Sequence, residues 1–202
     1  MDIVLYILLA VILCFVGVIL ARTLMFKPKH TVEADDSKVK FDSERAVENL
    51  RQLVRCKTVS YSDSALEDDA EFEKLIRLLP ELYPNVFKNC EYNELPDRGL
   101  LFKWKGKNNG EPTVLMAHYD VVPVDEKGWQ KPPFEAILED GVIWGRGTLG
   151  TKVTFGGVLF AADTLIAEGF VPQNDVYFAF SGGEEVNGKG AERIVDWLIV
   201  RK

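Results

Sequence analysis

The sequence predicts an α/β layered domain with a mostly parallel sheet, preceded by one membrane-spanning helix. The first 26 of the 202 residues are almost entirely apolar, and the remainder has the composition of a soluble domain with enough Val, Ile, Leu and Phe to build a core. In that remainder, short apolar runs typical of buried strands alternate with stretches of helical period, which is the pattern of α/β proteins.

The N-terminal segment is predicted to be an uncleaved membrane anchor. Residues 3–21 carry no charge, and at roughly 1.5 Å per residue they span about 28 Å, close to the hydrocarbon thickness of a bilayer. A cleaved signal peptide would have a basic start and a small-residue cleavage site, and the sequence shows neither. Arg22, Lys27 and Lys29 follow the apolar run, so the positive-inside rule favours a cytoplasmic main domain on three charges.

The chain is thus predicted to have three parts. Residues 1–26 form the anchor, residues 27–40 form a polar linker, and residues 41–202 form the folded domain. His30 lies in the linker, where we expect it to be solvated.

Periodicity and turn residues place the elements of the folded domain in order. The first helix has a serine as its predicted cap, and a turn at 107–110 separates the first two strands. The predicted elements are helices over 43–56 and 66–82, strands over 100–105 and 113–117, a helix over 155–169, a strand over 175–181 and a helix from 191 to 200.

Charge and cysteine usage exclude some classes of function. The net charge is −7 with the acids spread along the chain, whereas a nucleic-acid-binding surface needs clustered Lys and Arg. Cys14, Cys56 and Cys90 are odd in number and show no CxxC spacing, which argues against a disulfide framework and against a thiolate zinc site.

Three segments carry the candidate chemistry. They are MAHYDVVPV at 116–124, IWGRGTLGTK at 143–152 and FSGGEEVNGKG at 180–190. Each follows the C-terminal end of a predicted strand or lies in a Gly-rich loop, and that edge is where open α/β sheets bind ligands.

His118 and Asp120 are two residues apart at a strand end, so their side chains share a face. A carboxylate there can hold one imidazole N–H and leave the other nitrogen for a metal ion. The alternative is a satisfied polar pair with no metal.

Glu184 and Glu185 are adjacent, directly after a buried strand and two glycines. Two crowded carboxylates are costly unless a cation or solvent compensates them. One can bind zinc while the other takes a proton from a metal-bound water. The alternative is an acidic pair that opens a surface loop.

Four blocks taken together resemble the M20 metallopeptidases, in particular the Gly-X carboxypeptidase and N-acyl-amino-acid hydrolase branch. The blocks are AHYDVVPV, GWQKPPF, DGVIWGRGTL and SGGEEVNGKGA, and the likeness extends over about 43–202. The resemblance implies a three-layer α/β/α zinc-peptidase catalytic domain, of which this chain carries the N-terminal part. It also implies hydrolysis of an amide bond next to a free carboxylate, in peptides or N-acyl amino acids.

The resemblance also implies roles for four residues in a site with two zinc ions. His118 would bind one zinc, with Asp120 as the partner that supports its ring. Glu184 would be the general base for the bridging water, and Glu185 would bind the other zinc.

The chain departs from the family pattern in two ways. Gly150 stands where the family has the Asp that bridges both zinc ions, and neither Asp140 nor Asp163 is an obvious substitute. Family members are also longer and supply another acidic ligand and a second zinc-binding histidine, whereas His118 is the one histidine of the folded part here. We therefore expect weak or no zinc binding and no activity from the 202-residue chain, and an unfinished sheet with an exposed edge.

Three interpretations remain open. The chain is part of the sequence of a hydrolase, a non-catalytic truncated product, or a membrane-anchored binding module on the peptidase scaffold. The predicted partners are a small peptide or N-acyl amino acid and, through the N-terminal helix, a membrane, but no nucleic acid.

Overall fold

The computed structural model describes residues 2–27 and 39–200, which divide into a first unit up to Lys40 and a second unit from Phe41. In the first unit, the described residues form helix α1 (Asp2–Leu24), and its apolar side chains are exposed along its length. Residues 28–38, which include Lys29 and His30, lie outside the described residues.

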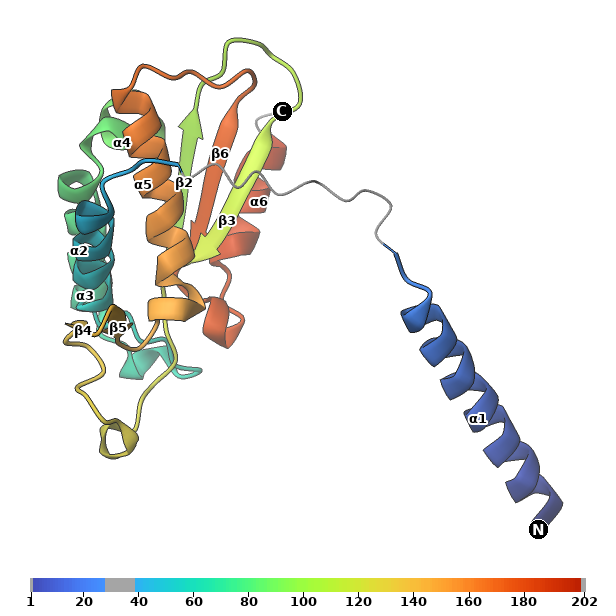
Figure 1. Cartoon of the computed structure of the whole chain (residues 1–202). Coiled ribbons are helices and arrows are strands. Elements are labelled where there is room, and N and C mark those ends of the chain that lie inside the picture. The colour runs from blue at the N-terminus through green and yellow to red at the C-terminus, as the bar shows by residue number, and fades with distance from the viewer. Residues whose placement is uncertain (1, 28–38, 201–202) are drawn as a thin grey trace. The chain divides into compact units, whose positions relative to one another are not determined.

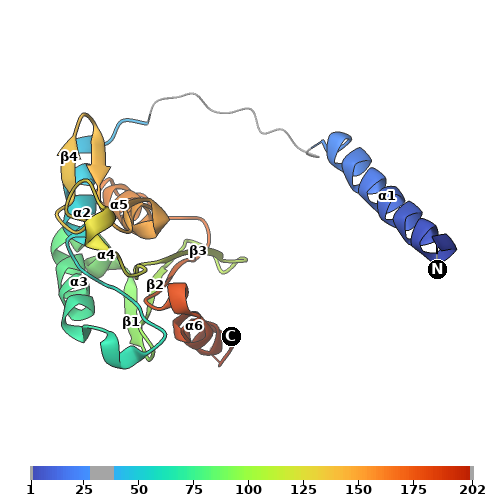
Figure 2. The same ribbon diagram turned by 90° about the horizontal axis from the view of Figure 1, so that it is seen from below.

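The second unit is a four-stranded sheet with helices on both faces. The strands are β1 (Glu91–Leu95), β2 (Gly99–Trp104), β3 (Thr113–His118) and β6 (Val176–Ser181), in the order β1-β2-β6-β3. On one face lie α2 (Ser43–Val54), α3 (Asp69–Leu82), α4 (Pro84–Asn89) and α5 (Val153–Ala167), and on the other lies α6 (Gly190–Val200) (Figures 1 and 2). The described part therefore has the predicted α/β/α layers.

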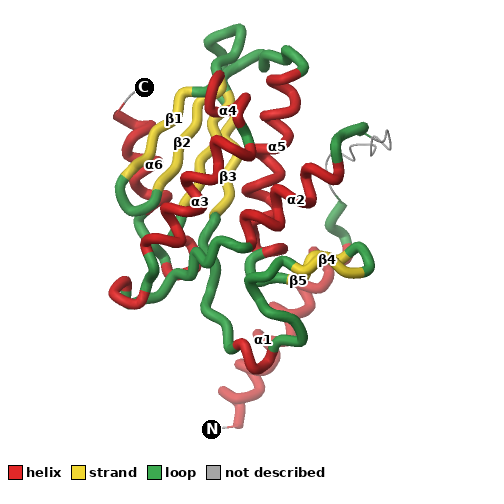
Figure 3. Tube along the Cα trace, turned by 90° about the vertical axis from the view of Figure 1, so that its left-hand side faces the viewer, coloured by secondary structure: helices red, strands yellow, loops and turns green. Residues whose placement is uncertain are grey.

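Short elements complete the unit. Strands β4 (Ile137–Glu139) and β5 (Val142–Trp144) form a hairpin apart from the main sheet (Figure 3). The remaining short helical segments are η1 (Ser64–Leu66), η2 (Glu126–Gly128), the kinked turn η3 (Thr148–Lys152) and η4 (Glu184–Val186).

The strands alternate their side chains between two cores. Leu100 and Phe102 of β2 lie in the larger core under α2–α5, where Phe155 meets Phe180 of β6 at a ring-centroid distance of 4.8 Å. Leu101 of β2 packs on the opposite face against α6. Because these central strands are buried on both faces, they appear in the sequence as continuous apolar runs.

The prediction of a mostly parallel sheet is wrong. Only β3 and β6 pair in parallel among the described strands, whereas β1 with β2 and β2 with β6 are antiparallel. The tight turn at 96–98 forces β1 and β2 into a hairpin, and β6 enters the sheet between β2 and β3. The strands on either side of the turn at 107–110 are therefore not neighbours.

Most predicted elements are present, with shifted ends. The first helix is capped by Asp42, whose carboxylate accepts the Arg45 N–H at 3.0 Å, instead of by the predicted serine. Helix α3 begins at Asp69 and not at 66, after its own cap Asp68. The three cysteines are all unpaired, as expected.

The outer edge of β3 is open among the described residues. Thr113 N donates to Asp175 O and Tyr119 N donates to Ser181 O, so the odd-numbered residues bond toward β6. The N–H and C=O groups of Val114, Met116 and His118 therefore point outward. Val114, Leu115 and Met116 are 40–65% exposed, and an apolar pocket of 520 Å³ opens between β3 and α5. The described part thus shows the exposed edge that the sequence predicts.

We expect this edge to promote self-association, because it carries no charge or proline that would block strand pairing. Met116→Lys should weaken self-association several-fold, because facing like charges on paired strands cost about 1 kcal/mol. Light scattering of the detergent-solubilised chain measures the effect. Met116→Leu and the remote charge change Asn109→Lys serve as controls, and equal scattering from all variants would contradict the prediction.

Candidate functional site

The fold brings the three candidate segments to one end of the sheet. His118 is the last residue of β3, and its register partner in the parallel neighbour β6 is Ser181. Glu184 and Glu185 follow β6 at once, in η4. The third segment continues from β5 into η3, which packs beside β3. The candidate residues thus lie at the carboxyl ends of two adjacent parallel strands, which is the position that the sequence predicts for them.

Asp120 is the centre of this site. Its side chain is completely buried, and His118 Nδ1 lies 3.2 Å from its Oδ1 and 3.1 Å from its backbone carbonyl oxygen. Oδ1 also accepts the backbone N–H of Glu184 at 3.1 Å, and Oδ2 accepts that of Glu185 at 3.1 Å. One carboxylate therefore orients the imidazole and fixes the loop that carries both glutamates.

These contacts shift the acid–base behaviour of the pair. Burial raises the pKa of Asp120, but the hydrogen bonds from His118 and from the Glu185 amide outweigh it, so the pKa of Asp120 lies below its usual value. The hydrogen bond to Asp120 raises the pKa of His118, against the opposing effect of burial. The ionised carboxylate is thus the stable form, and it accepts the Nδ1–H of His118.

With Nδ1 held, the other imidazole nitrogen faces the glutamates. His118 Nε2 lies 3.7 Å from Glu184 Oε2, and the Glu184 side chain is 59% exposed while that of His118 is 15% exposed. Glu185 is tied to the pair through its backbone amide. The structure therefore brings together all four residues that the sequence singles out, with His118 Nε2 and the Glu184 carboxylate within ion-pair distance of each other.

Two glycines let the segments pack this closely. A Cβ at Gly182 would lie 2.5 Å from the Tyr119 ring, and a Cβ at Gly147 would lie 2.2 Å from Val121. Gly147 also has a φ of 81°, which side chains disfavour. Tyr119 and Val121, the two neighbours of Asp120 in the chain, thus rest directly on the other two segments.

The described residues do not fit a two-zinc site. They contain no group of three or more His, Cys, Asp or Glu side chains placed to hold a metal ion, and a catalytic zinc needs about three protein ligands. Gly150 offers no ligand, although a Cβ built there meets nothing within 4 Å. Asp163 cannot replace it, because its buried carboxylate binds Arg45 at 2.8 Å and the Asn85 amide at 2.7 Å.

The sequence did not predict the role of Lys152. This lysine is fully buried, and its Nζ donates to Leu53 O at 2.9 Å and Cys56 O at 2.6 Å, at the C-terminal end of α2. Burial lowers its pKa to about 8. A charged residue at the start of an apolar helix was the available signal, and its partners lie about a hundred positions away.

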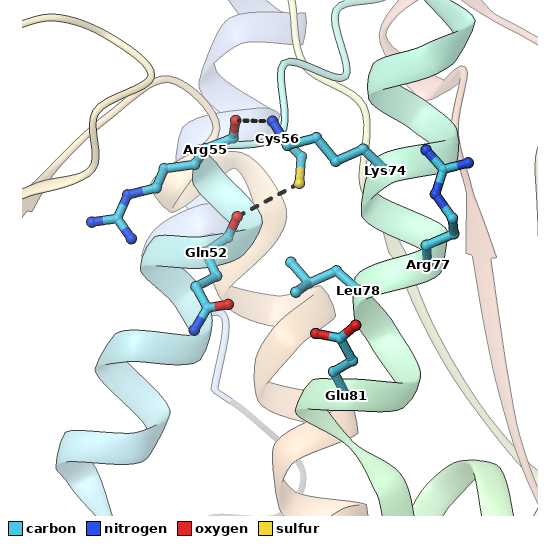
Figure 4. Close-up of a pocket in the computed structure, with 7 residues that line it drawn as sticks. All are labelled: Gln52, Arg55, Cys56, Lys74, Arg77, Leu78 and Glu81. Carbon is cyan, nitrogen blue, oxygen red and sulfur yellow. Dashed lines mark hydrogen bonds between the residues drawn. The ribbon is translucent and has the colours of Figure 1, made fainter.

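A pocket between α2 and α3 is separate from this site (Figure 4). Its volume is 440 Å³, and the Cys56 thiol at its wall donates to Gln52 O. Burial raises the pKa of Cys56, so the thiol is not activated as a nucleophile. Three cations line the pocket, and each is paired. Arg55 pairs with Glu48 of α2, and Lys74 and Arg77 pair with Glu71 and Glu73 of their own helix.

The chain is similar to known hydrolases in sequence. Residues 114–202 match the profile of peptidase family M20/M25/M40. The chain is 34% identical to the N-fatty-acyl-amino acid synthase/hydrolase PM20D1.1 of Danio rerio, over 96% of this chain and 40% of that protein. It is 33% identical to the probable carboxypeptidase S-like 2 of Dictyostelium discoideum, over 80% of this chain and 33% of that protein. The chain thus spans less than half the length of these curated relatives.

Solved structures share the fold. Human carnosine dipeptidase 1 matches with a TM-score of 0.60 at 19% identity, over 75% of this chain and 34% of that one. YXEP of Bacillus subtilis, described as a dinuclear metal-binding peptidase of the M20 family, matches with a TM-score of 0.50 at 19% identity, over 79% of this chain and 41% of that one.

The buried carboxylate makes a prediction about stability and pH. Asp120→Asn should lower the free energy of unfolding at pH 7 by about 2–3 kcal/mol, because charged hydrogen bonds are lost. The native pKa of Asp120 is depressed, so its contribution is present above the unfolded-state pKa of about 3.9 and is lost as the pH falls through the native pKa. The difference between wild type and Asp120→Asn should therefore shrink below about pH 4.

Urea unfolding across this pH range measures the difference. Asp140→Asn is the matched control, because Asp140 lies in an exposed turn with a φ of 50° that Asn tolerates. A difference for Asp120→Asn that does not change with pH would contradict the assigned role.

Proposed function

This chain belongs to peptidase family M20, and from that membership we propose that it supplies part of the catalytic domain of a zinc-dependent hydrolase. The proposed substrates are peptides or N-acyl amino acids, whose amide bond is cleaved. The names of its relatives, a carboxypeptidase and an N-fatty-acyl-amino acid synthase/hydrolase, support this substrate class.

One observation carries the proposal. The Asp120 carboxylate holds the His118 ring through Nδ1 and the Glu184–Glu185 loop through two amides. This leaves Nε2 of His118 and both glutamate side chains at the open end of the sheet, where a substrate and its cofactor can reach them. A polar pair that served only stability would not need to hold the loop that carries two further carboxylates.

We assign the roles as follows. His118 and Glu185 would each offer one ligand to a metal ion, and Asp120 would keep His118 in the tautomer that leaves Nε2 as the ligand atom. Glu184 takes a proton from the water whose oxygen bonds to the scissile carbonyl carbon. It then passes that proton to the nitrogen as the carbon–nitrogen bond breaks.

Gly150 favours a second candidate for the chain as it stands, a binding module on the peptidase scaffold without turnover. The described residues lack the carboxylate that the family has at this position, so they do not complete the metal site. The space around Gly150 is open and its φ is −115°, so the Cβ of an aspartate meets no neighbouring atom there.

Gly150→Asp separates the two candidates. In the 202-residue chain it should tighten zinc binding at least on the order of tenfold, because the new carboxylate adds a third ligand to His118 and Glu185. Isothermal titration with zinc measures the effect, and the isosteric Gly150→Asn is the control. In a form extended to the length of the relatives, Gly150→Asp should also raise hydrolysis of N-acyl amino acids or peptides, and adding Glu184→Gln should abolish it. No gain in either measurement would favour the binding module.

We further propose that α1 anchors the protein in a membrane. Residues Ile3–Leu24 have a mean hydropathy of 3.3, and none of this apolar stretch is buried. Such a helix is typical of either a bilayer span or a signal sequence. The second apolar stretch, Thr148–Ala167, is 39% buried and includes α5, whose Phe155 and Leu159 lie in the larger core. It therefore belongs to the folded domain.

Extraction of cell membranes at alkaline pH tests the anchor. The protein should stay in the pellet with its N-terminal residues intact. Leu13→Arg together with Val16→Arg should release it, because each charge costs about 2.5–3.5 kcal/mol at the centre of a span. Val39→Arg, outside the helix, should change nothing. A soluble product that lacks its first residues would instead identify a cleaved signal sequence.

A further inference from the structure

The turn between β1 and β2 has an unusual backbone. Asp97 and Arg98 both have positive φ values, 58° and 62°. Residues with a Cβ occupy this left-handed region rarely, and they stay there only where surrounding contacts hold them. The contacts of this turn therefore show which groups hold its backbone and which groups it positions.

The side chain of Arg98 is anchored outside the site. Its Nη1 donates to Glu67 at 2.6 Å and its Nη2 to Asp69. Its guanidinium carbon lies 3.6 Å from the centroid of the Phe72 ring, which is a close cation–π contact. These partners lie in and beside the start of α3, so Arg98 connects the turn to the helical layer.

The backbone carbonyl of Arg98 points the other way, into the site. It accepts the Gly182 N–H at 3.0 Å and the Tyr119 hydroxyl at 3.0 Å. Tyr119 lies between His118 and Asp120, and Gly182 begins the loop that carries Glu184 and Glu185. Both acceptor positions of this one carbonyl are thus used, one on each half of the site.

We infer that Arg98 is a positioning residue, which fixes the spacing between the His118–Asp120 pair and the Glu184–Glu185 loop by holding its own carbonyl against both. Its catalytic meaning rests on the hydrolase function proposed above, but the positioning itself is a property of the fold. Asp97 is not equivalent: its carboxylate binds Arg193 of α6 at 2.7 Å.

Hydrogen–deuterium exchange on the full chain in detergent tests this inference. Arg98→Gly removes the anchors but tolerates the left-handed backbone. It should speed amide exchange over residues 182–185 on the order of tenfold, while α5 keeps its protection. Asp97→Gly is the matched control, because it places a glycine in the same turn and keeps the Arg98 anchors. It should leave exchange at 182–185 within about twofold of wild type.

A second variant approaches the same contact from its other end. Glu67→Gln should speed exchange at 182–185 in the same direction by a smaller factor, and adding it to Arg98→Gly should give little further change. Additive effects would contradict a shared anchor. Equal exchange at 182–185 in Arg98→Gly and Asp97→Gly would overturn the inference.

Global unfolding of Arg98→Gly would appear as faster exchange in every segment. Arg98→Lys then decides, because it keeps a cation near Glu67 and Phe72 but cannot reproduce both guanidinium hydrogen bonds. A rise confined to 182–185 supports positioning, and a uniform rise or no rise overturns it. None of these readouts requires turnover, so an inactive chain still tests Arg98, and a failure here leaves the hydrolase proposal to its own experiment.

Discussion

The site depends on one constraint, the need to satisfy the buried charge of Asp120. An ionised carboxylate without solvent is costly unless donors surround it, and here the donors come from two strands. The imidazole of His118 comes from β3, and the amides of Glu184 and Glu185 come from the loop after β6. They meet only because β3 and β6 are adjacent and parallel, with His118 level with Ser181. The parallel pair, although a minority in this sheet, is therefore the pair that the chemistry requires.

The same geometry shows what these residues can and cannot do. They present one imidazole nitrogen and two carboxylates, and at the position of the family's bridging carboxylate they present Gly150 with open space around it. The described residues thus carry part of the site proposed above, but they hold no group of three or more ligands placed for a metal ion. The chain spans 40% and 33% of the length of the two relatives.

Local patterns in the sequence predicted the parts of the fold that local physics determines. The apolar runs that became β2, β3, β6 and α5 and the helical period of α2 were visible, as was the shared face of His118 and Asp120. Strand β1 was not visible, because EYNEL is a polar edge strand, and α4 is only six residues long. The direction and order of the strands, the buried Lys152 and the carbonyl of Arg98 depend on partners that are distant in sequence. No period or motif reports such contacts.

The most direct test of the central claim is to follow the amide resonances of Glu184 and Glu185 by NMR as the pH is lowered. If the Asp120 carboxylate accepts both amides, the two resonances should lie downfield at neutral pH. They should then move upfield together, with one midpoint below the usual Asp value of about 3.9, and lose this step in Asp120→Asn. Separate midpoints near the ordinary glutamate value, unchanged in Asp120→Asn, would show that each amide follows its own side chain, and the account of the site would be wrong.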